Sequence, residues 1–355
     1  MVNERFIDIN LGNKCNFRCA YCYEDNMEER VGSISDEVIQ KTISFIEGLL
    51  RHYKNTVFVL NFWGGEPLLH TKQMIPFLEH FYDNPRIKFM MITNGSLIEN
   101  HKNMLLKYRH KFMVQVSYDF EPCNSKNRTT WETSEKIREN MLWLDENCFN
   151  WWIKTTMFTH DLSTSLYDTY MNFISFRKKL KNTNITMNIT PDTRVWETQI
   201  FDLSAIEREM KRLILYFIEN KIETTYFTWF DRYSKAECHS PKGGCLIDID
   251  GKVYPCHGCS YMKPDVKNNF MLYSVYDEDC VDKFVYYVTN FDIHQPYKCR
   301  TCDTWLCYRC NSSVAQMDDG TINSWNNPNP DYQCKIYKTI SKYIYAYKKI
   351  MNKGK

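Results

Sequence analysis

The chain has 355 residues, of which 43% are hydrophobic and 25% charged, and its formal net charge is +2. This is the composition of a globular protein with room for a barrel-sized unit and a smaller second one, and no apolar run is long enough to cross a membrane. The near-neutral charge argues against a dedicated nucleic-acid binder, and no signal peptide precedes the first strand-like run, so we expect a cytoplasmic protein.

Six strand-like runs alternate with helical patterns in the first two thirds of the chain, at residues 6–11, 57–62, 88–93, 112–117, 153–158 and 185–189. The clearest helix follows the N-cap candidate Ser35 and carries Ile39, Ile43, Ile46 and Leu50 on one face. Repeated βα units predict a parallel sheet, in which the loops at the carboxyl ends of the strands carry the chemistry. Periodicity alone leaves an open doubly wound sheet and a barrel as alternatives.

After residue 230 the alternation stops and cysteines become frequent, so we expect a barrel domain at 1–230, a cysteine-rich domain at 231–335 and a C-terminal helix at 336–355. The apolar stripe of the last helical pattern contains Ile336, Ile340, Tyr343, Tyr347 and Ile350. Lysines on the opposite side predict a docked helix with a solvated face. An RNA-binding or membrane-surface helix is the alternative.

Fifteen residues are cysteines, and three of them, Cys15, Cys19 and Cys22, follow the first predicted strand on one short loop. In a reducing compartment, metal binding explains such a number better than disulfides. Three thiolates on one loop can hold three irons of a 4Fe–4S cube and leave the fourth iron open for a chelating ligand. Structural zinc is the alternative, but it requires four ligands, and no fourth Cys or His lies nearby in the sequence.

The spacing CxxxCxYC, with Tyr21 before the third cysteine, resembles the signature of the radical S-adenosylmethionine (SAM) superfamily. The segment Gly64-Gly65-Glu66-Pro67, after the second predicted strand, matches a further motif of this family. The resemblance implies that this segment contacts the amino group of SAM. Glycines let the backbone approach a ligand closely, and Glu66 supplies an anionic acceptor for an ammonium group.

Other matches follow the third and fourth predicted strands, where Thr93 and Asn94 complete the expected SAM-binding set. The resemblance implies that Ser117 meets the SAM ribose and that Arg128 meets the SAM carboxylate, a group that suits the bidentate fork of arginine. A surface position is the alternative for Arg128. Asp119 is a candidate catalytic residue, with the capping of a turn as its alternative.

Beyond residue 230 the order C…GxxxxC…CxxC…CxxC…C resembles the SPASM domain, which binds two auxiliary 4Fe–4S clusters in many radical SAM enzymes. The family commonly has five and three residues between the later cysteines, whereas this chain has four and two. A zinc ribbon is the alternative for such pairs. The resemblance implies that the first auxiliary cluster is held by Cys238, Cys245, Cys256 and Cys310. It implies that the second is held by Cys299, Cys302, Cys307 and Cys334.

Five further residues, four cysteines and one histidine, have less certain roles. Cys259 is a candidate substitute ligand of the first auxiliary cluster. His257 stands where sulfatase-modifying relatives carry an aspartate that accepts a proton, so it is a catalytic candidate; a hydrogen bond to a cluster sulfur is the alternative. Cys123, Cys148 and Cys280 are expected to be buried apolar residues.

The resemblance implies an α/β fold, a partial (β/α)6 TIM-like barrel followed by a small cysteine-rich α+β iron–sulfur domain. It also implies an oxidoreductase that cleaves SAM reductively to a 5′-deoxyadenosyl radical and oxidises or crosslinks a residue in a peptide or protein. The expected cofactors are SAM and three 4Fe–4S clusters, and the expected electron donor is a flavodoxin or ferredoxin. Because the first strand begins near Phe6, we expect a leader peptide to be bound by a separate leader-binding protein or by the barrel itself.

Three alternatives to this function remain open. An anaerobic sulfatase-type maturase is the first, and His257 counts against it. The second is a radical SAM enzyme that acts on a small molecule or nucleotide. The third, from a different class, is a zinc-binding module without catalysis.

Overall fold

The computed structural model describes residues 3–22, 32–157, 166–182, 185–191, 203–231, 244–259, 267–290, 302, 304 and 330–352. The chain divides into two compact units. The first consists of Met1–Val116, Glu135–Trp151 and His239–Ile293. The second consists of Ser117–Ser134, Trp152–Cys238 and His294–Lys355. The predicted domain boundaries at residues 230 and 335 stay a prediction.

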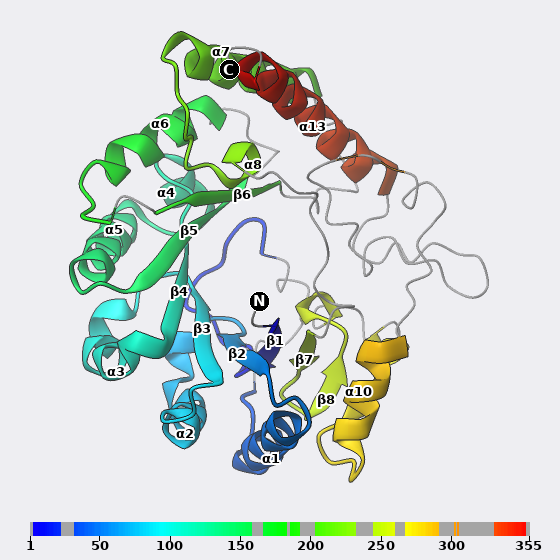
Figure 1. The fold of residues 1–355 in the computed structure, drawn as a ribbon. Helices are drawn as coiled ribbons and strands as arrows, with labels where there is room; N and C mark the ends of the chain where they lie inside the picture. Colours follow the sequence, from blue (N-terminus) through cyan, green and yellow to red (C-terminus); the bar gives the residue numbers. More distant parts are fainter. Residues whose placement is uncertain are drawn as a thin grey trace. The chain divides into compact units, whose positions relative to one another are not determined.

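The first unit is built on a sheet with the strand order β4-β3-β2-β1-β7-β8-β9 (Figure 1). Its strands are β1 (Asn3–Asn10), β2 (Thr56–Trp63), β3 (Ile87–Thr93), β4 (Phe112–Ser117), β7 (Cys245–Ile247), β8 (Lys252–Tyr254) and β9 (Tyr273–Ser274). Neighbouring strands from β4 to β7 are parallel, and β7, β8 and β9 are antiparallel. Residues after 240 therefore extend the sheet on the far side of β1.

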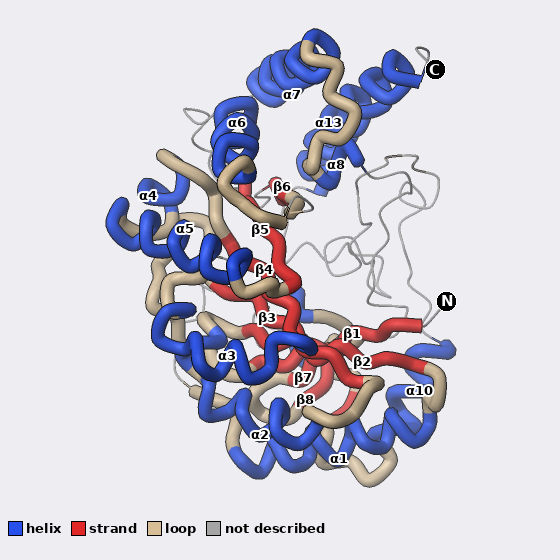
Figure 2. Tube along the Cα trace, turned by 60° about the vertical axis from the view of Figure 1, so that its left-hand side comes forward, coloured by secondary structure: helices blue, strands red, loops and turns tan. Residues whose placement is uncertain are grey.

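Helices of the first unit pack along this sheet, as the tube in Figure 2 shows for α1, α2 and α3. They are α1 (Asp36–His52), η1 (Pro67–Leu69), α2 (Thr71–Phe81), η2 (Ile98–His101), α3 (Lys102–Tyr108), η3 (Arg109–Lys111), α5 (Trp131–Glu146), η5 (His257–Cys259) and α10 (Cys280–Asn290). The predicted N-cap of α1 is confirmed, because Ser35 Oγ accepts a hydrogen bond from Val38 N at 3.2 Å. Ile39, Ile43 and Leu50 are buried, as predicted.

Aromatic side chains fill the layer between these strands and helices. The Phe62 ring on β2 lies 5.9 Å from Phe77 of α2 and 6.1 Å from Phe89 of β3, centroid to centroid. Alternate residues of a strand point to opposite faces. The side chains next to Phe62, those of Asn61 and Trp63, therefore lie on the other face of the sheet, called here the inner face.

Within the described residues, the second unit contains a parallel strand pair and five helices. They are β5 (Asn150–Met157), β6 (Met187–Pro191), α4 (Cys123–Asn127), α6 (Leu166–Arg177), α7 (Leu203–Glu219), α8 (Thr228–Asp231) and α13 (Pro330–Asn352). All six strands predicted for the first two thirds of the chain are thus present as β1 to β6. The α/β fold class with a parallel sheet is confirmed.

The C-terminal helix α13 packs on α7, as its apolar stripe predicts. The Tyr347 ring lies 5.6 Å from Phe217, and Tyr347 Oη donates to the carbonyl of Ile222 at 2.9 Å. The predicted stripe is wrong at one position, because Ile350 is 50% exposed. Ile344, which the predicted stripe does not include, is buried. Ile350 lies in the last turn of α13, one turn beyond Tyr347.

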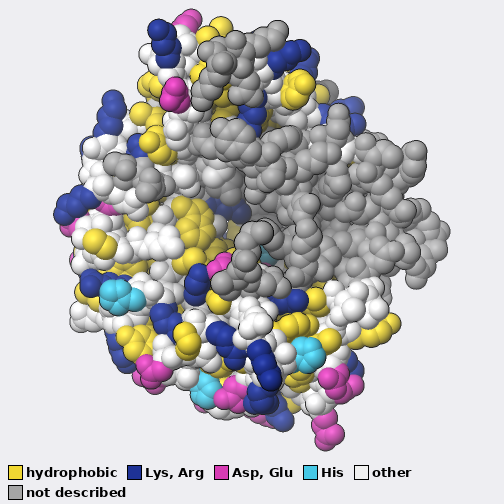
Figure 3. Space-filling view, in the orientation of Figure 1, with side chains coloured by type: hydrophobic (Ala, Val, Ile, Leu, Met, Phe, Trp, Pro, Cys, Tyr) yellow, Lys and Arg dark blue, Asp and Glu magenta, His cyan; other side chains and the backbone are white. Residues whose placement is uncertain are grey.

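The surface of the described residues mixes side chains of different kinds. Figure 3 shows basic, acidic and hydrophobic side chains interspersed on one face. Within the described ranges, no helix combines the length and hydropathy that a bilayer span requires.

Cys123 and Cys280 are buried, as predicted, but Cys148 is exposed. After α5 the N–H of Phe149 donates to Leu144 O and the N–H of Cys148 donates to Asp145 O, both at 3.1 Å. These two bonds form a Schellman motif, which requires a left-handed residue at the position of Cys148. Its φ is 56°, so backbone geometry, and not apolar packing, determines where its side chain points.

Glycine is the residue that best suits such a left-handed position. We expect Cys148→Gly to raise the free energy of unfolding by about 1 kcal/mol, because a Cβ in this conformation is strained. Anaerobic chemical denaturation measures the change. Cys148→Ala removes the same thiol but keeps the Cβ, so it should leave stability unchanged; an equal gain from both variants would contradict the explanation.

Candidate active site

The cysteine loop, residues 11–22, follows β1 and lies beside the segment that follows β2. The N–H of Gly65 donates to Gly12 O at 3.0 Å, and the N–H of Glu66 donates to Lys14 O at 2.8 Å. Leu11 N also donates to Trp63 O at 3.0 Å, which continues the pairing of β1 with β2. The backbone of the loop is therefore held by the backbone of residues 63–66.

Both glycines of this segment are required by the close approach of the loop. A Cβ at Gly64 would lie 2.3 Å from Gly12 O, and a Cβ at Gly65 would lie 2.3 Å from Lys14 O. Gly64 also has a φ of 142°, which other residues rarely adopt. The sequence suggests that the glycine pair gives a ligand access to the backbone; in the structure the pair admits the cysteine loop.

Glu66 is buried, and its carboxylate accepts three hydrogen bonds. The donors are Leu68 N at 3.1 Å, Thr93 Oγ1 at 2.6 Å and Asn94 N at 2.8 Å. A buried carboxylate needs such donors to offset its desolvation. Glu66 consequently joins the end of β2 to the end of β3, and its contact with the amino group of SAM stays a prediction.

A ring of three polar side chains ties the cysteine loop to the end of β3. Asn94 Nδ2 donates to Asn16 Oδ1 and Asn16 Nδ2 donates to Ser96 Oγ, both at 2.9 Å. Ser96 Oγ closes the ring by donating to Asn94 Oδ1 at 2.7 Å. The sequence indicated Asn94 but missed Asn16 and Ser96, which only the fold brings together.

The three cysteines of the loop, Cys15, Cys19 and Cys22, are half-buried, and Tyr21 is buried. Cys15 Sγ accepts a hydrogen bond from Phe17 N at 3.4 Å. Burial, together with the nearby charges of Glu66 and the other two cysteines, raises the pKa of Cys15 to about 12. A thiolate there needs a cationic partner, which the irons of a cluster supply.

The donor set of this loop fits an iron–sulfur cluster better than a single ion. Among the described residues no three His, Cys, Asp or Glu side chains are close enough to share one metal ion. In a cube each thiolate binds a different iron, so the three sulfurs stand farther apart than around one ion.

His257 follows β8, and its ring reaches the inner face of the sheet. Its Nδ1 lies 3.1 Å from Asp8 Oδ2 on β1, and its ring centroid lies 5.8 Å from that of Trp63. Asp8 Oδ1 accepts from Asn61 Nδ2 at 2.7 Å. A carboxylate oxygen accepts hydrogen bonds, so the ring donates through Nδ1 in this contact. The sequence indicated His257 but gave no sign of Asp8.

In the second unit, Ser117 ends β4 and Asp119 follows it in a buried position. The Asp119 carboxylate accepts from Thr156 N at 2.8 Å, and Asp119 N donates to Asn124 Oδ1 at 3.2 Å. Asp119 thus accepts a hydrogen bond from the backbone of β5. Such a contact with a backbone N–H resembles the turn cap that is the alternative to a catalytic role. Arg128 is half-buried at the end of α4, where its N–H donates to Asn124 O at 3.0 Å.

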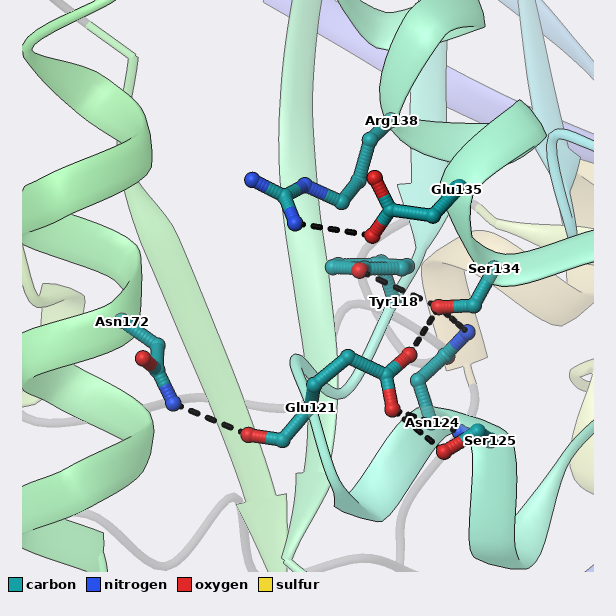
Figure 4. Close-up of polar contacts among 8 residues, drawn as sticks. All are labelled: Tyr118, Glu121, Asn124, Ser125, Ser134, Glu135, Arg138 and Asn172. Atoms are coloured by element: carbon teal, nitrogen blue, oxygen red, sulfur yellow. Dashed lines mark hydrogen bonds and ion pairs between the residues drawn. The ribbon is translucent and has the colours of Figure 1, made fainter. Parts of the chain in front are cut away.

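Figure 4 shows the polar network that holds the segment between β4 and α5. The Glu121 carboxylate accepts from the hydroxyls of Ser125 and Ser134. Asn124 Nδ2 donates to Ser134 Oγ at 3.0 Å, and Tyr118 Oη lies 3.2 Å from the same hydroxyl. These side chains fix the conformation of the segment that carries Asp119, and nothing in the sequence pattern indicates them.

Four of the cysteines expected to hold auxiliary clusters lie outside the described residues, namely Cys238, Cys299, Cys307 and Cys310. Of the others, Cys302 and Cys334 are half-buried in the second unit, and the thiol of Cys302 donates to Thr304 Oγ1 at 3.0 Å. Cys245 and Cys256 belong to the first unit, together with Cys259.

The tight contact between Gly65 and the cysteine loop leads to a prediction. Gly65→Ala should lower the free energy of unfolding by about 2 kcal/mol and reduce the iron retained on anaerobic purification, because its Cβ meets backbone that cannot rotate away. Gly48→Ala in α1 is the matched control, since its Cβ meets side chains, Val281 at 2.5 Å and Arg51 at 3.8 Å, and no backbone atom within 4 Å is among its three nearest neighbours. Wild-type stability and iron content in Gly65→Ala would refute the requirement for glycine.

The comparisons with known proteins agree with this geometry. The family model of the radical SAM superfamily matches residues 9–191. The radical SAM cyclopropyl synthase TigE of Paramaledivibacter caminithermalis is 25% identical over 285 residues, which cover 72% of this chain and 57% of TigE. This chain therefore spans little more than half the length of that relative.

Two solved structures share the fold. Native anSMEcpe with bound AdoMet has a TM-score of 0.68 at 19% identity, over 99% of this chain and 100% of that one. SuiB of Streptococcus suis, bound to the precursor peptide SuiA, has a TM-score of 0.53 at 16% identity, over 87% of this chain and 73% of SuiB. The family match covers just over half of the sequence and contains the cysteine loop and the Gly64-Gly65-Glu66-Pro67 segment. The chain belongs to the radical SAM superfamily.

Proposed function

We propose that this protein cleaves SAM reductively and uses the resulting radical to oxidise or crosslink a residue in a peptide or protein substrate. The observation that carries the proposal is the half-buried set of Cys15, Cys19 and Cys22, held on a loop whose backbone is bound by Gly65 and Glu66. When bound, a 4Fe–4S cluster supplies one electron to SAM, and the 5′-deoxyadenosyl radical abstracts a hydrogen atom from the substrate.

The residues of the chain bind and orient the cofactors in this proposal. The three cysteines hold three irons of the cluster, and the ring of Asn16, Asn94 and Ser96 fixes the loop between them. Glu66 and Thr93 are the proposed SAM contacts of the first unit. Glu66 already accepts three hydrogen bonds, so its orientation is set before SAM arrives, which lowers the cost of binding.

A peptide substrate is proposed from the peptide-bound neighbours of this fold, and the GTP 3′,8-cyclases among the curated relatives keep a small-molecule substrate as the alternative. SuiB was solved with its precursor peptide SuiA, and TigE is named as a cyclopropyl synthase. The later cysteines are proposed to hold two auxiliary clusters that accept the electron released on substrate oxidation. A flavodoxin or ferredoxin is the proposed donor for SAM cleavage, and a separate leader-binding protein is a proposed partner. The fifteen cysteines favour the reducing cytoplasm as the location.

His257 is proposed to accept a proton from the substrate during oxidation. Its ring is half-exposed on the inner face, and its Nδ1 lies 3.1 Å from Asp8 Oδ2. The anaerobic sulfatase-type maturase is the second candidate, and the extent of the fold likeness to anSMEcpe keeps it open. The resemblance implies an aspartate at the position of His257 in that group, so the proposed proton acceptor of this chain differs from it.

The proposed SAM chemistry predicts a simple result with purified protein. Reduced under anaerobic conditions with SAM, the protein should release 5′-deoxyadenosine, and it should carry about twelve irons if three cubes are present. Replacing Cys15, Cys19 and Cys22 together by alanine should abolish the release and remove about one third of the iron. Cys148→Ala is the matched control because that thiol is exposed away from the loop. Release of 5′-deoxyadenosine by the triple variant would refute the assignment.

The contact between Asp8 and His257 gives a separate prediction about substrate oxidation. With the peptide encoded beside the gene, His257→Ala should slow the loss of substrate hydrogen by about 100-fold. Asp8→Asn should also slow it, because an amide offers one neutral acceptor oxygen in place of the two carboxylate oxygens that contact His257 and Asn61. Mass spectrometry of the peptide measures the rate, and 5′-deoxyadenosine release in the absence of peptide should be retained in both variants.

The control for this pair is Glu4→Gln, which changes another carboxylate of β1. Glu4 forms an exposed ion pair with Lys88 and lies four residues before Asp8 on β1. An oxidation rate in His257→Ala equal to that of Glu4→Gln would show that His257 takes no part in the reaction.

A further inference from the structure

Two of the cysteines expected to share the first auxiliary cluster, Cys245 and Cys256, stand on opposite sides of a strand pair. Cys245 begins β7, which is an interior strand: it pairs with β1 on one side and with β8 on the other. A side chain on an interior strand points to one face of the sheet and cannot pass to the other. The face that Cys245 uses therefore decides what it can bind.

The register places Cys245 on the helix-covered face. Cys245 pairs with Ile7, and paired residues of neighbouring strands share a face. On the same face, Val253 pairs with Tyr273, whose ring lies 6.0 Å from that of Phe45 in α1. Cys245 is 1% exposed, so its thiol lies in the apolar layer between sheet and helices.

The surroundings of the thiol agree with this placement. Burial raises the pKa of Cys245 above its usual range. Burial also raises the pKa of Tyr273, and the nearby Cys245 and Cys280 contribute further. Cys245 thus lies with Tyr273 and Cys280 in the packed layer, where a free cysteine behaves as a small apolar residue.

Cys256 and Cys259 lie together on the other side. The N–H of Cys259 donates to Cys256 O at 3.0 Å across η5, and the two thiols are hydrogen-bonded to each other. His257, between them, reaches Asp8, which pairs with Leu246 and so shares the inner face with it. Tyr254 also pairs with Leu246 and therefore lies on the inner face.

We propose that Cys259, and not Cys245, acts with Cys256 as a ligand of the first auxiliary metal centre. A Cys-x-x-Cys turn presents two thiols to one centre, which is the arrangement found in iron–sulfur and zinc sites. That the centre is a 4Fe–4S cluster rests on the proposed function, whereas the choice of cysteine rests on the two faces of the sheet. Cys245 serves instead as part of the packed layer with Cys280.

Metal content of single alanine variants of the full chain tests the assignment. We compare Cys259→Ala and Cys245→Ala with Cys256→Ala, which should lose the centre, and with Cys280→Ala, a buried cysteine of the same layer. After anaerobic purification, Cys259→Ala should lose as much iron as Cys256→Ala, about one third of the total if three cubes are present. Cys245→Ala should keep the iron content and the visible spectrum of Cys280→Ala.

The opposite pattern, iron lost from Cys245→Ala and retained in Cys259→Ala, overturns the proposal. If Cys245→Ala loses iron because the packed layer is disturbed, Cys245→Val separates the two causes, since valine fills the space and cannot bind a metal. Retained iron in Cys245→Val supports the proposal, and iron lost from a Cys245→Val protein that melts at the wild-type temperature overturns it.

The identity of the metal separates this proposal from the proposed function. Zinc lost from Cys256→Ala and Cys259→Ala, but not from Cys245→Ala, would confirm the ligand assignment and refute the auxiliary cluster. Release of 5′-deoxyadenosine, measured in the same samples, reports on the cysteine loop and is not needed for the ligand assignment.

Discussion

The backbone bonds from Gly65 and Glu66 to the carbonyls of Gly12 and Lys14 are the constraint on which the site depends. Each such bond contributes only about 1 kcal/mol, but the two are formed where there is no space for a Cβ. The loop with three cysteines is long and polar, and without this support its thiols would sample many arrangements. Two backbone bonds and two glycines therefore fix the loop together with its buried side chains Leu11, Phe17 and Tyr21.

Burial of the Glu66 carboxylate extends the same constraint to the next strand. A buried charge is tolerated only with several donors, and here Leu68, Thr93 and Asn94 provide them. These hydrogen bonds hold the end of β2 against the end of β3. The ring of Asn16, Asn94 and Ser96 then connects the end of β3 to the cysteine loop. Polar side chains outside the apolar core therefore link the ends of β1, β2 and β3.

The periodic features of the chain could be predicted from its sequence, and features that depend on tertiary contacts could not. All six strands and the N-cap at Ser35 follow from local patterns of apolar residues and capping side chains. The cysteine loop could be predicted from the spacing of its three cysteines and from the family resemblance. Exposure of Cys148 depends on a left-handed residue in a Schellman motif, which no glycine marks in the sequence. Likewise, the face occupied by Cys245 follows only from its register with β1, because a three-residue strand shows no alternation.

Strand β1 positions the later cysteines as well as the first three. Asn10, its last residue, accepts from Gly12 N at 3.1 Å where the cysteine loop begins, and Asn10 Nδ2 donates to Asp248 Oδ1 at 2.7 Å. Two residues earlier, Asp8 contacts His257. Side chains of β1 therefore position the turn that contains Cys256 and Cys259. This turn and the cysteine loop belong to the same compact unit.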